Sequence, residues 1–498
     1  MRGLFTRLLA GGAAYQAASV VSAVLALVTL PLYTRALSRA DFGVAETLLT
    51  FIILASILLR FGLGEAFVRF YFQTPAEERN RLARTTTATV LLATTVTALL
   101  AAAVAGPLSS LLLGFEDAGL MRIAVLGLWA FTNLEIAYAL LRVDERRRLY
   151  MTASLCNVVL SVALTVTLVV ALDQGARGYL AGNYVGSAVV LLGLWWALRG
   201  RIGRSGRTGR IGRIGRRAHE PRSALAPIRP LLRFGVPTVP ADATVFALNV
   251  VDRAYLLRAQ SAAAAGLFAL SVKLATAVIL AVRGFQLAWP PLAYSIGDDR
   301  EAGRFYAAVT TWYVAVTGFV VAGLTLLGRW VVRLLAAPEY FAAHEALPWV
   351  ALGWAMYGLF LVLVTIGGRA GVTTRTFPAA LAGVVVNALA LVLLVEPLGI
   401  AGAGIALVVS YGVMLVVLHL LTRRLFAVPF DWRRLAHAVF LLAVVSVAGE
   451  LLLPDAGVAG FATRALALAS IPLLFALTRF ARPTELAALR GALRRQRR

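Results

Sequence analysis

The residues of this sequence that could do chemistry are charged or polar side chains within long apolar stretches. They are Glu46, Arg60, Glu65, Glu135, Asp242, Asp252, Arg253, Lys273, Arg283 and Gln286. A charge placed in bilayer hydrocarbon costs from about 2.5 to more than 10 kcal/mol, so such residues commonly face a cavity, form pairs or carry protons. The planar guanidinium of arginine also matches the oxygens of a phosphate group. These residues are therefore candidates for anion binding and for ion coupling.

Arg60 and Arg283 take equivalent places in a pattern that occurs twice. Gly43 precedes Arg60 by 17 residues, and Gly266 precedes Arg283 by 17 residues. The pattern predicts two parallel repeats related by an axis along the membrane normal. If both arginines face a central cavity, they form a receptor for a diphosphate. Alternatively, both long side chains reach back to the lipid head groups.

The other candidates divide into substrate contacts and coupling groups. Lys273 is the only lysine of the chain, and we expect it at a depth in the membrane similar to that of Asp252. An ion pair between them is predicted, either as a clasp between adjacent helices or as part of a substrate path. The predicted substrate contacts are Arg60 and Arg283 together with Lys273, Arg253 and Gln286. The predicted ion-pair or coupling acids are Asp252, Glu65, Asp242 and Glu135.

Metal and covalent chemistry have little support in the sequence. Cys156 is the only cysteine, and the four histidines show no metal-ligand spacing. We expect no metal, no cofactor and no catalytic residue. A membrane enzyme such as a polysaccharide polymerase needs acid and base groups on a sizeable outer loop. The longest outer loop predicted here is only Gly328–Ala346, so we expect that the protein is not an enzyme.

The elements that must position these residues are membrane-spanning helices. The chain has 498 residues, of which 60% are hydrophobic and 14% charged, against about 25% charged in an average soluble domain. Apolar runs of about 20 residues, enough to cross the bilayer as helices, recur along its length. The predicted fold class is an all-α polytopic membrane protein with about fourteen spans: Ala10–Leu32, Phe42–Leu63, Ala83–Ala105, Gly119–Leu141, Tyr150–Leu172, Gly178–Leu198, Arg233–Leu257, Ala264–Ala288, Phe305–Leu327, Leu347–Gly367, Thr376–Val395, Gly399–Leu421, Arg434–Leu453 and Val458–Phe480.

The distribution of charge predicts the topology and the domains. The net charge is +24, and the basic residues gather in alternate loops and at both termini, which places both termini in the cytoplasm by the positive-inside rule. This explains the basic pI without nucleic acid. The predicted domains are an N-lobe of six helices (1–198), a basic Gly/Arg linker (199–230), a C-lobe of six helices (231–426), and two further helices with a basic tail (427–498).

Several segments resemble a known family of membrane proteins. They are Leu30–Ser38 with Asp41–Gly43, Phe61–Leu63 with Arg69–Phe72, Arg233–Pro237, Asn249–Arg253, Gly266–Phe268 through Lys273–Ala275, and Phe285–Pro291. With them the chain resembles the Wzx-type oligosaccharide flippases and polysaccharide biosynthesis proteins of the multidrug/oligosaccharidyl-lipid/polysaccharide (MOP) exporter superfamily. The resemblance implies two pseudo-symmetric six-helix lobes around a central cavity, plus two carboxy-terminal helices.

The resemblance also implies a function. It is the translocation of an oligosaccharide linked to a polyprenyl diphosphate across the bacterial plasma membrane, by alternating access, for cell-surface polysaccharide biosynthesis. The implied partners are this lipid-linked oligosaccharide, membrane lipids and polysaccharide polymerase or assembly proteins. One alternative is a lipid II flippase, which acts on the peptidoglycan precursor. Another is a drug/cation antiporter of the same superfamily, which the absence of a carboxylate from the first apolar run (10–32) disfavours.

Overall fold

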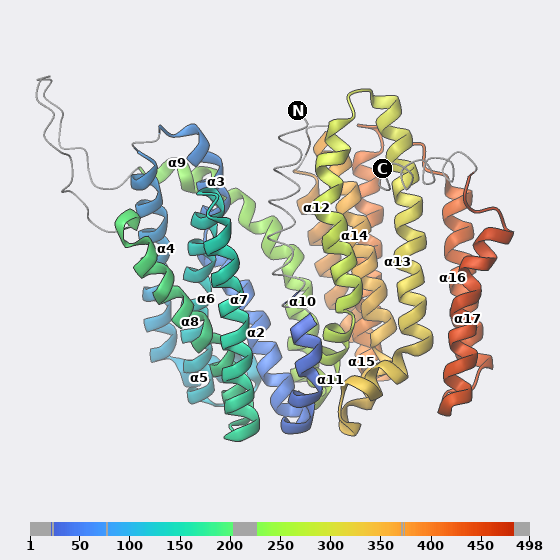
Figure 1. Cartoon of the computed structure of the whole chain (residues 1–498), viewed down its shortest axis with the longest axis horizontal. Coiled ribbons are helices and arrows are strands. Elements are labelled where there is room, and N and C mark those ends of the chain that lie inside the picture. The colour runs from blue at the N-terminus through green and yellow to red at the C-terminus, as the bar shows by residue number, and fades with distance from the viewer. Residues whose placement is uncertain are drawn as a thin grey trace, which may run out of the picture. The chain divides into compact units, whose positions relative to one another are not determined.

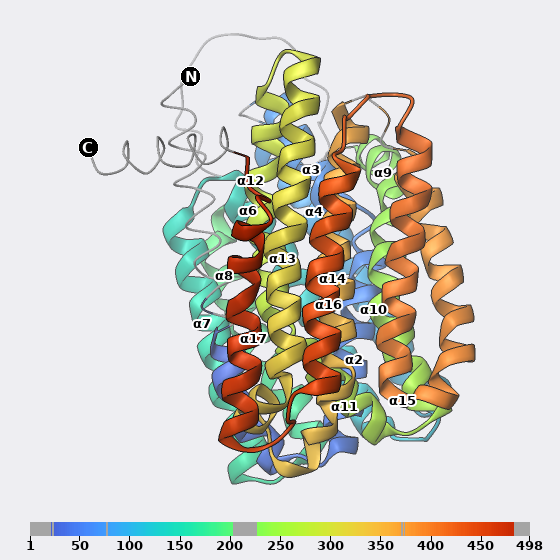
Figure 2. The same cartoon turned by 90° about the vertical axis from the view of Figure 1, so that its right-hand side faces the viewer.

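The computed structural model describes residues 21, 24–75, 78–202, 227–369, 372 and 374–482. Every regular element in these ranges is helical (Figures 1 and 2). Ten of the described helices are long and apolar enough to cross a membrane, and two bent helix pairs raise that number to twelve. The all-α, multi-span fold class is confirmed, whereas the count of fourteen spans is not. The chain forms two compact units, Met1–Ala269 and Leu270–Arg498.

The first unit is built around α6, which contacts α2, α4 and α8. These four helices and their neighbours bury aromatic and aliphatic side chains such as Phe67, Tyr138 and Leu191 in one core. A shorter apolar helix, Val24–Ala36, precedes them. The elements of the unit are α2 (Arg39–Leu59), α3 (Leu63–Gln73), α4 (Arg79–Ala103), α5 (Ala105–Leu113), α6 (Ala118–Val143), α7 (Arg147–Val166), the π-helix η1 (Thr167–Ala171), α8 (Gly175–Ile202), α9 (Arg229–Gly235), the 3-10 helix η2 (Val236–Thr238), α10 (Val239–Ala259) and most of α11 (Ala262–Leu274).

Glycines bring distant segments of this unit into backbone contact at two places. A Cβ atom on Gly43 of α2 would lie 2.5 Å from the backbone nitrogen of Gly266 in α11. Near the other end of α2, a Cβ atom on Gly62 would lie 2.1 Å from the carbonyl oxygen of Gly235 in α9, and Gly62 also has a left-handed φ of 64°. A larger residue at either contact would force the backbones apart, and at Gly62 it would also be conformationally strained.

The second unit is formed by long helices that run side by side (Figure 2). Its α13 has 37 residues, about 55 Å at 1.5 Å per residue, so it extends beyond a hydrocarbon core of about 30 Å. In α15 the helix breaks at Gly399, where φ is 56° and ψ is −135°, just after Pro397. The elements are α12 (Thr276–Ser295), α13 (Asp299–Leu335), the 3-10 helix η3 (Pro338–Glu345), α14 (Leu347–Arg369), α15 (Thr376–Thr422), α16 (Trp432–Leu452) and α17 (Gly457–Leu477).

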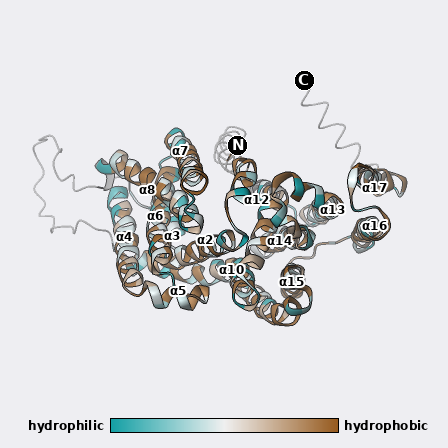
Figure 3. Ribbon diagram, turned by 90° about the horizontal axis from the view of Figure 1, so that it is seen from below, coloured by the Kyte–Doolittle hydropathy of each residue, from teal (hydrophilic) through white to brown (hydrophobic). Residues whose placement is uncertain are grey.

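Hydrophobic residues occur along most of the described helices (Figure 3), and many of their large side chains are exposed. Leu99, Leu126, Trp196, Leu393 and Leu452 are each more than 60% exposed. Large apolar groups exposed to this degree on many helices mark a surface that is not in contact with water. The chain is therefore a multi-span membrane protein.

The predicted spans agree well with the described helices. The break at Gly399 divides α15 into the two segments predicted as 376–395 and 399–421. The bent pairs α9–α10 and α11–α12 occupy the predicted spans 233–257 and 264–288. Most of the predicted first span, linker residues 203–226 and the tail from 483 lie outside the described residues. The division into lobes at the linker stays a prediction.

Candidate functional site

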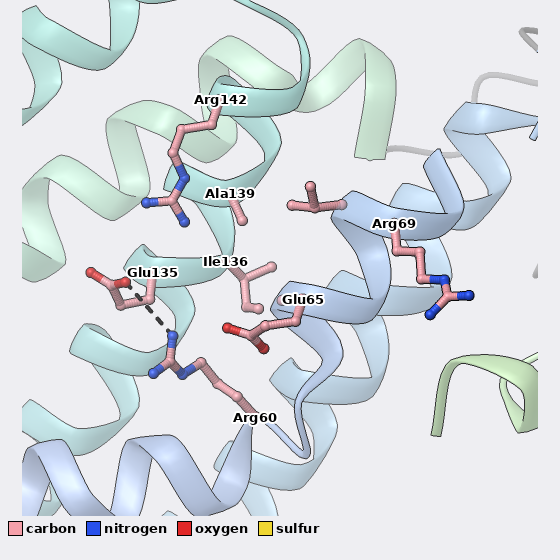
Figure 4. A pocket seen from close by; sticks show the side chains of 9 residues that line it. Arg60, Glu65, Arg69, Glu135, Ile136, Ala139 and Arg142 are labelled. Atoms are coloured by element: carbon pink, nitrogen blue, oxygen red, sulfur yellow. Dashed lines mark ion pairs between the residues drawn. The ribbon is translucent and has the colours of Figure 1, made fainter. Parts of the chain in front are cut away.

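The first unit contains a polar cavity of about 360 Å³ near the junction of α2 and α3 (Figure 4). Three arginines and two glutamates line it together with small and aliphatic residues. Three of the side chains come from α3 and four from α6. The lining residues are Arg60, Gly64, Glu65, Val68, Arg69, Glu135, Ile136, Ala139 and Arg142.

A sharp turn of the backbone positions Arg60 beside Glu65. The helix α2 ends at Leu59, and Phe61 and Gly62 then adopt left-handed φ values of 50° and 64°. Because α3 starts at Leu63, this two-residue reversal brings Glu65, in the first turn of α3, to the same cavity. For a non-glycine residue such as Phe61 the left-handed conformation costs roughly 1–2 kcal/mol. Strain of this kind is often found at functional sites.

Arg60 forms an ion pair across the cavity rather than along its own helix. Its Nη1 atom lies 3.7 Å from Oε2 of Glu135, and the two side chains are 23% and 29% exposed. Its Nε atom donates to the carbonyl of Ser56 at 3.3 Å. Figure 4 shows the side chains of Arg60, Glu65, Glu135 and Arg142 directed toward a common space. The guanidinium of Arg60 therefore lines a cavity and has one carboxylate partner.

Two further residues modify the charge of this cavity. Asp242, in the first turn of α10, lies within electrostatic range of Glu65 and Arg60. Arg69 points away from the other charged groups (Figure 4), and its guanidinium lies 4.4 Å from the ring centroid of Phe234 in α9. Four residues predicted from the sequence, Arg60, Glu65, Glu135 and Asp242, are thus brought together in one region of the first unit.

A second cluster of charges in the same unit is almost completely buried. It joins α2, α8 and α10 through Glu46, Tyr179 and Arg253. The side chain of Arg253 is only 8% exposed, and its Nη1 atom lies 3.9 Å from Oε2 of Glu46. Asp252 is 1% exposed and lies in electrostatic contact with Arg253. In this conformation Arg253 contacts Glu46 and is not part of the polar cavity.

The remaining predicted residues belong to the second unit. Arg283 and Gln286 are exposed on α12, and Lys273 is partly buried near the end of α11. That Arg60 and Arg283 line a common path stays a prediction, as does the ion pair between Asp252 and Lys273. Among the residues that the structure describes, no group of three His, Cys, Asp or Glu side chains could hold a metal ion.

The second unit has a larger cavity of about 900 Å³ with a mainly apolar lining. Residues of α13, α14 and α16 such as Val321, Leu352 and Val447 form most of its wall. Its charged and imidazole side chains lie at one end of the cavity. They come from α13 (Arg329), from η3 (His344 and Glu345) and from the end of α16 (Glu450). A cavity of this kind suits an elongated apolar molecule with a polar end.

A comparison with models of protein families assigns this chain to a family. The family model for "Polysaccharide biosynthesis protein" matches residues 8–292, which is more than half of the sequence. This chain is a member of the polysaccharide biosynthesis protein family. The matched region contains the polar cavity, the buried cluster of Glu46 and Arg253, and all of the residues predicted as site residues. A search of curated protein sequences finds no match.

Solved structures show the fold to which this member of the polysaccharide biosynthesis family belongs. The lipid II flippase MurJ in an inward closed conformation superposes with a TM-score of 0.73 at 14% identity, covering 94% of this chain and 98% of MurJ. A MATE-family multidrug resistance transporter gives TM-scores of 0.62 in its inward-facing and 0.57 in its outward-facing conformation, both at 14% identity. Each alignment covers 84% of this chain, and 99% and 94% of the transporter. The fold is that of MOP-superfamily transporters.

Two cavity residues of this polysaccharide biosynthesis protein were missed by the sequence prediction. Arg142 lies seven residues after Glu135, about two turns along the same face of α6. That spacing is the signal that could have identified it. Arg69 follows Glu65 by four residues on α3 and could have been found in the same way, but α3 was not predicted as a helix.

Proposed function

We propose that this MOP-superfamily transporter is a flippase for an oligosaccharide linked to a polyprenyl diphosphate. The observation that carries the proposal is the polar cavity beside Arg60 and Arg142 in a member of the polysaccharide biosynthesis family. A sugar diphosphate must leave water to cross the bilayer, so it needs cations and hydrogen-bonding groups along its path. The apolar carrier chain has no such need and can remain in contact with lipid or with an apolar cavity.

The roles of the individual residues follow from their charges. Arg60 and Arg142 supply guanidinium forks for the diphosphate oxygens. Glu135 pairs with Arg60 when the site is empty, and Glu65 and Glu135 accept hydrogen bonds from sugar hydroxyls when it is occupied. Because Glu135 already compensates Arg60, the ligand has to displace that carboxylate. We propose that Arg283 of the second unit provides a further cation when the lobes enclose the head group.

Alternating access would move the head group from the cytoplasmic to the outer leaflet. The proposed location is the bacterial plasma membrane with both termini in the cytoplasm, as the charge asymmetry of the loops predicts. The proposed partners are the lipid-linked oligosaccharide, the surrounding lipids and the polymerase or assembly proteins that receive the flipped product. The proposal assigns the protein no catalytic chemistry and no cofactor.

The experiment compares lipid-linked oligosaccharide on the two leaflets of a deletion strain with an impermeant glycan probe. The intact gene should restore outer exposure. Arg60→Gln and Arg142→Gln should each reduce the restored signal about tenfold or more, because each removes a charge-assisted contact worth about 1.5–3 kcal/mol. Arg122→Gln is the matched control, since Arg122 is exposed near the start of α6 and does not line the cavity. Normal outer exposure in both cavity variants would contradict the proposal.

A second candidate is a lipid II flippase, which the structural similarity to MurJ favours. Both substrates carry a diphosphate, so the same arginines would serve either one. The deletion strain separates the two candidates by the lipid that accumulates on the inner leaflet. Accumulation of the peptidoglycan precursor favours the second candidate, while accumulation of another amphiphile or a drug indicates the antiporter alternative.

A further inference from the structure

The apolar cavity of the second unit has no part in the proposed diphosphate site. Its volume of about 900 Å³ lies at the upper end of the range for small-molecule sites. Along α13 the cavity extends from Tyr313 to Arg329, which is about 24 Å at 1.5 Å per residue. The hydrocarbon core of a bilayer is about 30 Å thick. The cavity is therefore elongated along the helix axis and long enough to follow a lipid chain through most of the hydrocarbon.

One side of this cavity is open toward the bilayer. The helix α13 lies between α14 and α16 and packs against both, whereas α14 and α16 do not pack closely on each other (Figures 1 and 3). Val439, Val447 and Leu451 of α16 line the cavity, yet each of them is more than half exposed. An apolar cavity does not hold water, and unfilled space loses dispersion contacts. In a membrane, lipid chains that reach the open side can therefore fill it.

The polar end of the cavity lies where the helices terminate. Glu345 precedes the first residue of α14 by two positions, and Glu450 lies two residues before the end of α16. Arg329 pairs with Glu450 at 3.5 Å and with Asp455, in the loop after α16, at 2.5 Å. Helix ends that carry charged side chains belong at the membrane surface. A lipid whose chain occupies the cavity therefore has its head group at this end.

The groups at the polar end are mostly hydrogen-bond acceptors. Arg329 is the one cation among the described lining residues, and it already has two carboxylate partners. Glu345 is exposed, and among the residues that the structure describes it forms no ion pair. The Nδ1 atom of His344 donates to the carbonyl of Phe341 at 2.8 Å, so Nε2 of the neutral ring is an acceptor. This end therefore suits a ligand that carries N–H donors and a positive charge.

We propose that the cavity between α13, α14 and α16 binds a phospholipid with an ammonium head group, such as phosphatidylethanolamine. One acyl chain lies in the cavity, and the ammonium group donates to Glu345 and to Nε2 of His344. The phosphate remains at the membrane surface, where Arg329 and water solvate it. An anionic head group has no such cation to offer, and it would meet the negative charges of Glu345 and Glu450. The polyprenyl diphosphate of the proposed substrate is anionic too, so this lipid site is separate from the substrate path.

The test uses the full-length protein in nanodiscs of phosphatidylcholine, whose quaternary head group has no N–H to donate. A small fraction of phosphatidylethanolamine with a photoactivatable diazirine in one acyl chain is added, and the labelled peptides are identified by mass spectrometry after irradiation. We expect the label on the lining segments of α13, α14 and α16. Phosphatidylglycerol with the same chains should label these segments about fivefold less, equivalent to about 1 kcal/mol.

Substitutions at exposed positions separate the contribution of the chain from that of the head group. Val447→Trp places a bulky ring in the cavity and should reduce labelling of α13 and α14 by both lipids. Val458→Trp is its matched control, because Val458 is exposed on α17 and does not line the cavity. Glu345→Gln should abolish the preference for phosphatidylethanolamine and leave labelling by phosphatidylglycerol in place. Glu339→Gln, which changes an exposed acid of η3 outside the lining, should keep the preference.

Three results would overturn the proposal. One is labelling of the lining no stronger than that of the exposed faces of α4 and α7, which would mean that no lipid is held there. Another is equal labelling by both lipids in the parent protein, which would mean that the head group is not recognised. The third is displacement of the label by dodecylammonium at lower concentration than by phosphatidylethanolamine, which would indicate a site for amphiphilic cations. None of these results depends on which lipid the protein moves, so the lipid site and the flippase function can fail independently.

Discussion

Arg464 is the buried cation whose removal should most clearly destabilise the second unit. It lies two turns into α17 with 0% of its surface exposed. Its Nη1 atom lies 2.5 Å from Oε1 of Glu450 in α16, and its other nitrogens donate to the carbonyls of Pro454 at 3.0 Å and Leu453 at 3.3 Å. One side chain thus binds α17 to α16 and to the loop between them.

The expected loss of stability follows from these contacts. Removing one partner of a buried ion pair typically costs 3–5 kcal/mol, because the other charge is left behind. The lower value applies here, since Glu450 is 30% exposed and keeps Arg329 at 3.5 Å. A loss of about 3 kcal/mol in Arg464→Leu corresponds to a fall in Tm of about 6–12 °C for a unit of this size.

The assay is thermal unfolding of the purified protein in detergent, followed by tryptophan fluorescence. Arg333→Leu is the matched control, because Arg333 is exposed in the last turn of α13, and its Tm should change little. The double variant Arg464→Leu/Glu450→Leu should lose less stability than Arg464→Leu alone, since it leaves no unpaired carboxylate. A double variant at least as unstable as the single one would refute the reasoning that an unpaired buried charge causes the loss.

Two further predictions concern the backbone reversal after α2 and the ion pair between Asp455 and Arg329. Gly62→Ala should lower the folded yield and the Tm severely, because the new Cβ would collide with a backbone carbonyl and the residue has a left-handed φ. The control Gly64→Ala should be tolerated, since no atom lies within 4 Å of the position of its Cβ. Equal effects of the two substitutions would contradict this explanation. The hydrogen bond from Arg329 holds the pKa of Asp455 below its ordinary value. The stability that this carboxylate contributes is present above its ordinary pKa and is lost as the pH falls through the lowered one. The Tm, measured from pH 5 to pH 2, should therefore fall less steeply in Asp455→Asn than in the parent protein. An equal fall in both proteins would contradict a stabilising ion pair between Asp455 and Arg329.

The positions of the helices were predictable because hydropathy alone determines which segments can cross a membrane. The short helices α3 and α5 were not predicted, since 11 and 9 residues cannot span the bilayer and give no long apolar run. The length of α13 was also missed. Its ends, at residues 299–304 and 328–335, carry charges and were read as loops, whereas the structure continues the helix through them.

The site was predictable as a set of residues but not as a set of contacts. Arg60, Glu65 and Glu135 were identified because charges are rare within apolar helices. The sequence could not identify Glu135 as the ion-pair partner of Arg60. That contact depends on how α2 packs on α6, which local spacing does not encode. Arg142 and Arg69 have only one signal in the sequence, their helical spacing from Glu135 and Glu65, and for Arg69 that signal was hidden because α3 was not predicted as a helix.

The equivalent glycines of the two predicted repeats deserve a physical explanation, because they touch each other. Residues related by a two-fold axis meet their own equivalents only where they lie close to that axis. The contact of Gly43 with Gly266 is therefore what a two-fold relation between repeats predicts for a position on the axis. Glycine permits the backbones to meet there, and no other residue does so without a shift.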